Sequence, residues 1–111
     1  MTAEVKFRRL QCLETEDNGQ DEVFLQFDGE PLFGIQAIET GQSIELNIVR
    51  EFNGEALVSL FDEDDIDEDD ALGTIVVAES EIGQGVIQEE FTGDDAHYLL
   101  FYSVRSADPD H

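Results

Sequence analysis

Positive charge is scarce in this sequence of 111 residues, which has 5 lysine and arginine residues against 28 aspartate and glutamate residues. The formal net charge is -23 at pH 7. Nucleic acids and anionic membranes would be repelled by such a chain, so neither is expected as a direct partner. Cations and basic proteins are the expected partners instead. Salt relieves self-repulsion of this kind, and the composition therefore favours a salt-adapted, halophilic protein.

Cysteines and long apolar segments are also scarce, and each absence excludes a class of protein. Cys12 is the only cysteine, so an internal disulfide is impossible and a reducing compartment is favoured. No segment approaches 18 consecutive apolar residues, and the first ten residues contain no apolar signal region. The sequence therefore predicts a cytoplasmic protein.

Apolar residues are sufficient for one core, because they make up 41% of the chain and include eight phenylalanines and two tyrosines. They occur in short runs separated by glycine, asparagine or acidic residues, which is typical of an antiparallel β-sandwich. We therefore expect an all-β, eight-stranded antiparallel sandwich over residues 1–105 and a flexible tail over residues 106–111. The expected strands cover residues 4–13, 22–27, 30–36, 43–52, 55–61, 73–79, 86–92 and 96–105.

Two dipeptides predict tight hairpin turns in this sandwich. Asp28-Gly29 lies between the second and third expected strands, and Asn53-Gly54 lies between the fourth and fifth. Both dipeptides suit the type I′ turn, which requires a positive φ at each central residue.

Carboxylates are concentrated in two predicted loops, with eight acids among the nine residues 62–70 and five among residues 14–22. The two loops can emerge at the same end of a sandwich. Their carboxylates would then raise one another's pKa values and destabilise the fold unless a cation lies between them. Oxygen ligands without nearby histidine or cysteine favour Ca²⁺ over zinc or copper. An EF-hand is excluded, because Asp67 would occupy the glycine position of a loop beginning at Asp62.

The segment "LVSLFDEDDIDEDDALGTIVV" (57–77) resembles the third calcium loop of C2 domains, which are eight-stranded β-sandwiches. In that family a strand ends in Asp-x-Asp, a third aspartate follows six residues later, and an apolar-Gly pair begins the next strand. These positions are occupied here by Asp62, Asp64, Asp70, Leu72 and Gly73. The resemblance implies that the three aspartates and the backbone carbonyl of Glu63 bind Ca²⁺.

The first acidic segment is similar to the first calcium loop of the same family, in which two aspartates are six residues apart. Glu16 and Glu22 have this spacing, and a shift of one residue would instead pair Thr15 with Asp21. We therefore include Glu16, Asp21 and Glu22 among the expected ligands. Asp17 is expected to form a turn, because it precedes Asn-Gly. The strand order resembles the permuted, type II topology of the family, since the first strand leads directly into this loop.

The sequence thus predicts a calcium-binding module in which Ca²⁺ supports fold stability or contact with a protein partner. No enzyme is expected, because His97 lies in a predicted strand and no nucleophile can be placed beside it. Membrane docking is not expected either, because the predicted tip offers only Ile66 and no basic cluster. Two alternatives remain open: a metal-independent, salt-adapted interaction or assembly module, and a nucleic-acid mimic that binds a basic protein.

Overall fold

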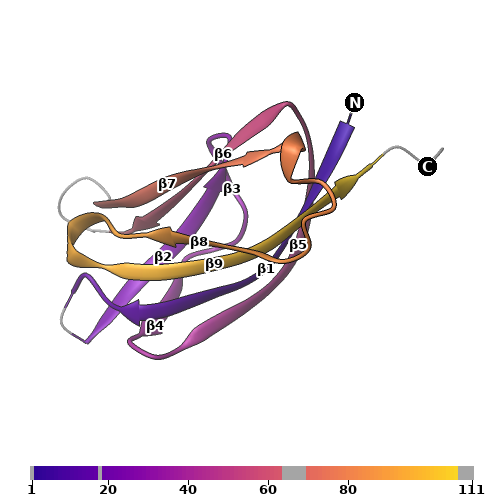
Figure 1. Cartoon of the computed structure of the whole chain (residues 1–111). Helices are drawn as coiled ribbons and strands as arrows, with labels where there is room; N and C mark the ends of the chain where they lie inside the picture. Colours follow the sequence, from indigo (N-terminus) through magenta and orange to yellow (C-terminus); the bar gives the residue numbers. More distant parts are fainter. Residues whose placement is uncertain (1, 18, 64–69, 108–111) are drawn as a thin grey trace.

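The computed structural model of the chain describes residues 2–17, 19–63 and 70–107 (Figure 1). Almost all of this part of the chain is in strands or in the turns between them. The strands are β1 (Thr2–Glu14), β2 (Gln20–Phe27), β3 (Glu30–Pro31), β4 (Gln36–Glu39), β5 (Ser43–Asn53), β6 (Glu55–Asp62), β7 (Asp70–Ala78), β8 (Ile87–Phe91) and β9 (His97–Ser106). Two short 3-10 helices, η1 (Glu79–Glu81) and η2 (Gly93–Asp95), flank β8. No helix in the described part of the chain is long and apolar enough to cross a membrane.

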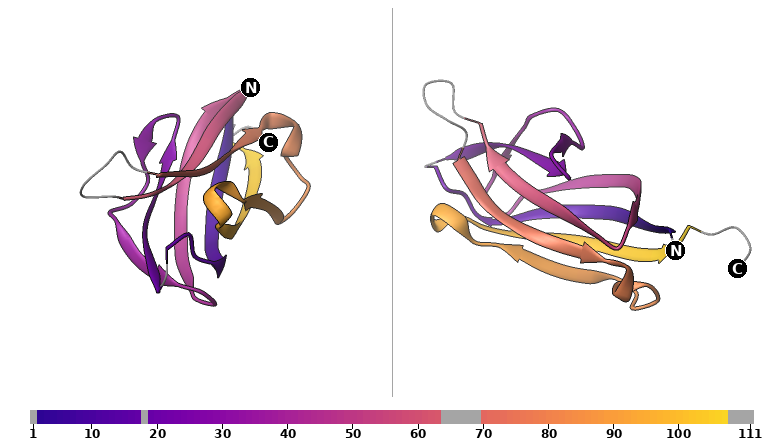
Figure 2. Two further views of the ribbon diagram at one scale, coloured as in Figure 1. Left: turned by 90° about the vertical axis from the view of Figure 1, so that its left-hand side faces the viewer. Right: turned by 90° about the horizontal axis from the view of Figure 1, so that it is seen from above.

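The strands form two antiparallel sheets that pack face to face (Figure 2). The first sheet has the order β5-β1-β9-β8. The second sheet has the order β3-β2-β6-β7, and β4 also pairs with β2. This architecture confirms the predicted all-β antiparallel sandwich.

The core lies between the sheets and follows the alternation of the strands. In β1, residues 3, 5 and 7 are buried, and a bulge at Arg8 then returns Leu10 and Cys12 to the same face. In β2, Asp21, Val23 and Leu25 are buried, whereas the residues between them are not. Because the inward face of β2 begins with an aspartate, a carboxylate enters the end of the core.

The predicted strand 30–36 is two short strands, β3 and β4, each paired with a different part of β2. Residues 32–35 between them lie outside both strands. Pro31 ends β3, and proline has no backbone N–H with which to extend a ladder. The ladder along β2 is therefore interrupted between β3 and β4, where the Leu32 N–H alone donates to the Leu25 carbonyl at 2.9 Å among the described residues.

Of the two predicted hairpin turns, the structure contains the one at Asp28-Gly29 but not the one at Asn53-Gly54. Asp28 and Gly29 both have positive φ angles of 48° and 87°, as the expected hairpin between β2 and β3 requires. The hairpin expected at Asn53-Gly54 is wrong, because β5 pairs with β1 while β6 pairs with β2 and β7. The chain crosses from one sheet to the other at this turn, and a dipeptide preference cannot show which strand the next segment will pair with.

Both described ends of the chain lie at one end of the sandwich, opposite the β1–β2 connection (Figures 1 and 2). Ser106 is the last residue of β9, and the Ala107 N–H donates to the Thr2 carbonyl. Residues 108–111 of the predicted tail lie outside the described residues. At the opposite end, the β4–β5 turn reaches β1, because the Gly41 N–H donates to the Cys12 carbonyl at 2.9 Å.

Candidate metal centre

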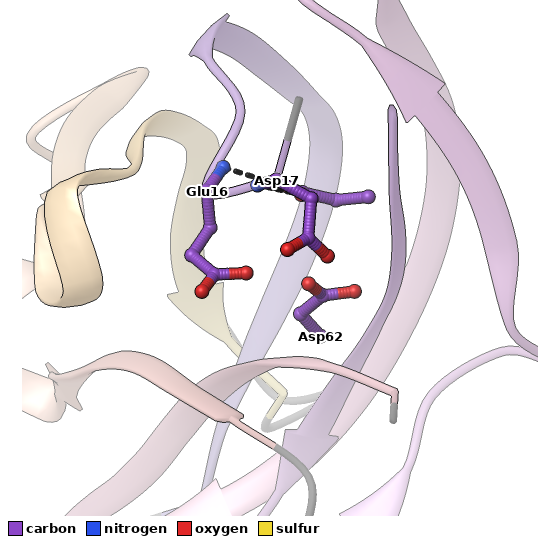
Figure 3. A group of neighbouring side chains, drawn as sticks. Glu16, Asp17 and Asp62 are labelled. Atoms are coloured by element: carbon purple, nitrogen blue, oxygen red, sulfur yellow. Dashed lines mark hydrogen bonds between the residues drawn. The ribbon is translucent and has the colours of Figure 1, made fainter. Parts of the chain in front are cut away.

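Four carboxylates from two connections converge at this end of the sandwich. Glu16 and Asp17 follow β1, Asp21 lies in β2, and Asp62 ends β6. One oxygen of each carboxylate lies within 4.8 Å of the others. Figure 3 shows the side chains of Glu16, Asp17 and Asp62 directed toward one another. The structure therefore places one acidic residue from the second predicted loop beside three from the first.

Asp21 is completely buried and anchors the β1–β2 connection. Its Oδ2 accepts the Glu16 N–H at 2.9 Å, and its Oδ1 accepts the Asp17 N–H at 2.9 Å. The Tyr98 hydroxyl, also buried, donates to Oδ2 at 2.5 Å. Burial and the Asp21 carboxylate raise the pKa of Tyr98, so this hydroxyl remains a proton donor. These three donors stabilise the buried charge and bring Glu16 and Asp17 over it.

Asp62 is 2% exposed, because β6 directs residues 56, 58, 60 and 62 toward the core. Its Oδ1 accepts the Glu22 N–H at 2.9 Å, and the Glu63 N–H donates to the Glu22 carbonyl at 2.7 Å. Burial raises the pKa of Asp62 from 3.8 to about 8, and the side chains of Asp17 and Glu16 and the charge of Asp21 contribute to this rise. The Glu22 N–H opposes this rise only in part.

The four carboxylates fit the chemistry of a hard cation. Two oxygens bound to one Ca²⁺ lie at most about 5 Å apart, since each metal–oxygen bond is about 2.3 to 2.6 Å long. The span of 4.8 Å in the cluster is within this limit. All four side chains offer oxygen, which Ca²⁺ prefers. In the ion-free protein a proton on Asp62 neutralises part of the negative charge of the cluster at neutral pH, because the pKa of Asp62 is about 8.

Among the residues predicted from sequence, the structure brings Glu16, Asp21 and Asp62 together. Glu22 is not in the cluster, because its side chain is exposed on the outer face of β2, whereas Asp21 lies on the inner face. The cluster matches neither of the two six-residue spacings, because it joins Glu16 of the first pair to Asp21 of the second and contains neither Glu22 nor Thr15.

The other three predicted positions lie on the second acidic segment. Glu63 lines a pocket that Phe24 also lines, and binding of an ion by its backbone carbonyl stays a prediction. Asp70 begins β7 and pairs with Asp62 across the sheet. Asp64 lies outside the described residues.

Sequence reasoning missed two residues of this site. Asp17 lies in a bend between β1 and β2, as expected, and its carboxylate also belongs to the cluster. The signal was its position four residues before Asp21, where its N–H can reach the Asp21 carboxylate. Tyr98 gave no sequence signal, because only the fold brings the start of β9 beside β2.

Solved structures similar to this chain include several C2 domains. A structure of two C2 domains of extended synaptotagmin 2 is 25% identical, with a TM-score of 0.59, and the match covers 94% of this chain and 40% of that one. A structure described as that of a C2 domain is 15% identical, with a TM-score of 0.59, over 95% of this chain and 98% of that one. A calcium-bound form of the extended synaptotagmin 2 domains is 22% identical, with a TM-score of 0.56, over 94% and 44% of the two chains. No family model matches the sequence, and no curated protein matches it.

Proposed function

We propose that this chain, a C2-like domain, binds Ca²⁺ between its two acidic connections and that the bound ion stabilises the fold and supports contact with a protein partner. The observation that carries the proposal is the convergence of four carboxylates, two of them buried, from segments about 40 residues apart in sequence. A C2-like fold supports it further, because one of the similar solved structures is calcium-bound.

The ion would act by neutralising carboxylates that otherwise repel. Glu16, Asp17, Asp21 and Asp62 would supply the ligand oxygens, with Asp64, Asp70 and the Glu63 carbonyl as further predicted ligands. A ligand that binds only the folded state stabilises it by about 2.7 kcal/mol at a hundredfold excess over the dissociation constant. The two connections would become ordered relative to each other, and their surface would become less negative.

The charge of the chain favours a protein over a membrane as the partner of this surface. The net charge is -23, and a few bound Ca²⁺ ions would leave it strongly negative. An anionic bilayer would still be repelled, whereas a basic protein would be attracted. We propose a binding module and assign it no catalytic residue.

Thermal unfolding with Ca²⁺ or Mg²⁺ in 1 M NaCl tests this function. We expect a saturable rise of the melting temperature with Ca²⁺ at micromolar to millimolar concentration and a smaller effect of Mg²⁺, which requires shorter bonds in a stricter octahedral geometry. Asp62→Asn should abolish the rise. The matched control is Glu55→Gln, which removes one exposed charge from the other end of β6, about 23 Å away. Equal weak protection by both ions would indicate general screening and would contradict a specific site.

A further inference from the structure

A second candidate site lies on the outer face of the second sheet, beside residues 32–35 that join β3 to β4. A pocket of about 290 Å³ is lined there by Phe24, Pro31, Phe33, Gly34, Ile35 and Glu63. Apart from Glu63, every lining residue is uncharged. Ile35 is 49% exposed at its edge. The pocket can therefore accept an apolar side chain.

An aromatic pair lies on the sheet beside this pocket. Phe24 of β2 stacks on Phe61 of β6 with ring centroids 5.3 Å apart and an angle of 17° between the rings. Farther along the same face, Ser59 and Thr74 share a hydrogen bond of 2.9 Å. Leu57 beyond them is 53% exposed. In a protein with 28 acidic residues, an apolar pocket beside this aromatic pair indicates an interaction site, and Leu57 lies outside the pocket.

The charges around this surface have one sign. The five basic residues of the chain are Lys6, Arg8, Arg9, Arg50 and Arg105. As the structure describes them, all five lie in β1, β5 or β9 of the first sheet, and none lies in the second. Two acidic residues lie beside the pocket, at the end of the second sheet that carries the carboxylate cluster. Glu63 lines the pocket, and the exposed Glu22 lies on the same face of β2 as Phe24, two residues before it. An apolar pocket thus lies in a negative field.

We propose that this pocket binds an apolar side chain of a positively charged segment of a partner protein, with lysine or arginine residues on either side of the apolar anchor. Charge complementarity selects this occupant. A second copy of the chain would bring the same carboxylates to the contact, and an anionic membrane would be repelled. The inference goes beyond the proposed calcium binding, because the pocket is on the outer face while Asp62 faces the core.

The test uses a six-residue peptide with phenylalanine and leucine at its centre and two lysines on each side. Its binding to the full chain is followed by NMR chemical shifts of backbone amides, at low and high salt. A peptide with glycine and serine at its centre controls for charge alone. We expect saturable shifts at Phe24, Ile35 and Glu63 with the first peptide only, and weaker binding at high salt.

Two matched variants locate the binding. Ile35→Ser removes an apolar wall in an exposed connection and should weaken peptide binding about fivefold. Leu57→Ser removes an equally exposed side chain on the same face outside the pocket and should leave binding unchanged. In Asp62→Asn, peptide binding should persist even if calcium binding is lost, which separates the two proposals.

Equal binding of the two peptides, or no binding of either, would overturn the proposal. So would equal effects of the two serine variants. Binding of vesicles of neutral phosphatidylcholine that Ile35→Ser abolishes would assign the pocket to lipid instead.

Discussion

Replacing Asp62 with asparagine is expected to stabilise the ion-free protein at alkaline pH while removing its response to Ca²⁺. Asparagine has nearly the same shape, and its Oδ1 can still accept the Glu22 N–H. It carries no charge, so the repulsion from the three neighbouring carboxylates disappears. One substitution should therefore have effects of opposite sign with and without the ion.

The pKa of Asp62 gives the size and pH range of this effect. Raising the pKa from 3.8 to about 8 costs the ionised, ion-free protein at most about 6 kcal/mol, at ~1.4 kcal/mol per pKa step. Between pH 4 and 8 the folded chain holds a proton on Asp62 that the unfolded chain releases, so stability falls as the pH rises through this window. Because Asp17 is exposed and admits water, we expect Asp62→Asn to gain about 1 to 3 kcal/mol at pH 8.5. At pH 5, where Asp62 is mostly protonated, the gain should be small.

Urea denaturation with a chelator present measures this difference. Wild type, Asp62→Asn and the control Glu55→Gln are compared at pH 5 and pH 8.5. The control should change the free energy of unfolding by less than about 0.5 kcal/mol at either pH, because Glu55 is exposed. The reasoning is refuted if Asp62→Asn is less stable than wild type at pH 8.5, or if its gain is the same at both pH values.

Three further substitutions test the parts of the site separately. Tyr98→Phe removes the hydroxyl donor to buried Asp21 and should lower the free energy of unfolding by about 1 to 3 kcal/mol in urea denaturation. Tyr102→Phe removes a hydroxyl that donates to Glu81 at 2.8 Å, away from the metal centre. It should destabilise the fold without changing the Ca²⁺ affinity measured by calorimetry, and a changed affinity would contradict the proposed location of the site. Asp17→Asn should weaken Ca²⁺ binding about tenfold. At pH 5, where Asp62 is mostly protonated, it should leave ion-free stability within about 0.5 kcal/mol, because Asp17 is exposed. An unchanged Ca²⁺ affinity would show that Asp17 is not a ligand.

The sequence predicts the sandwich well, because strand alternation is a local property. In β6 the buried residues 56, 58, 60 and 62 lie at every second position, and the same pattern places Asp62 at the end of the core. The C2 resemblance rested on this strand and its acidic segment. Similar solved structures agree with it over almost the whole chain.

The candidate site is less predictable, because a shift of one residue reverses the face of a strand. Glu22 and Asp21 could not be separated by spacing alone. The structure separates them through Tyr98, which lies 77 residues from Asp21 in sequence. The pocket on the outer face was missed for a related reason: it depends on the interruption between β3 and β4, which the continuous predicted strand 30–36 concealed.

Proton release on calcium binding tests the central claim most directly. A cation that replaces the proton of Asp62 must displace close to one proton at pH 7, because the pKa of this side chain is about 8 in the ion-free protein. Calorimetric titration of Ca²⁺ in two buffers with different ionisation enthalpies counts these protons. The account predicts a buffer-dependent heat at pH 7 that disappears at pH 9.5 and in Asp62→Asn. A saturable heat that is independent of the buffer at pH 7, or no saturable heat at all, would contradict it.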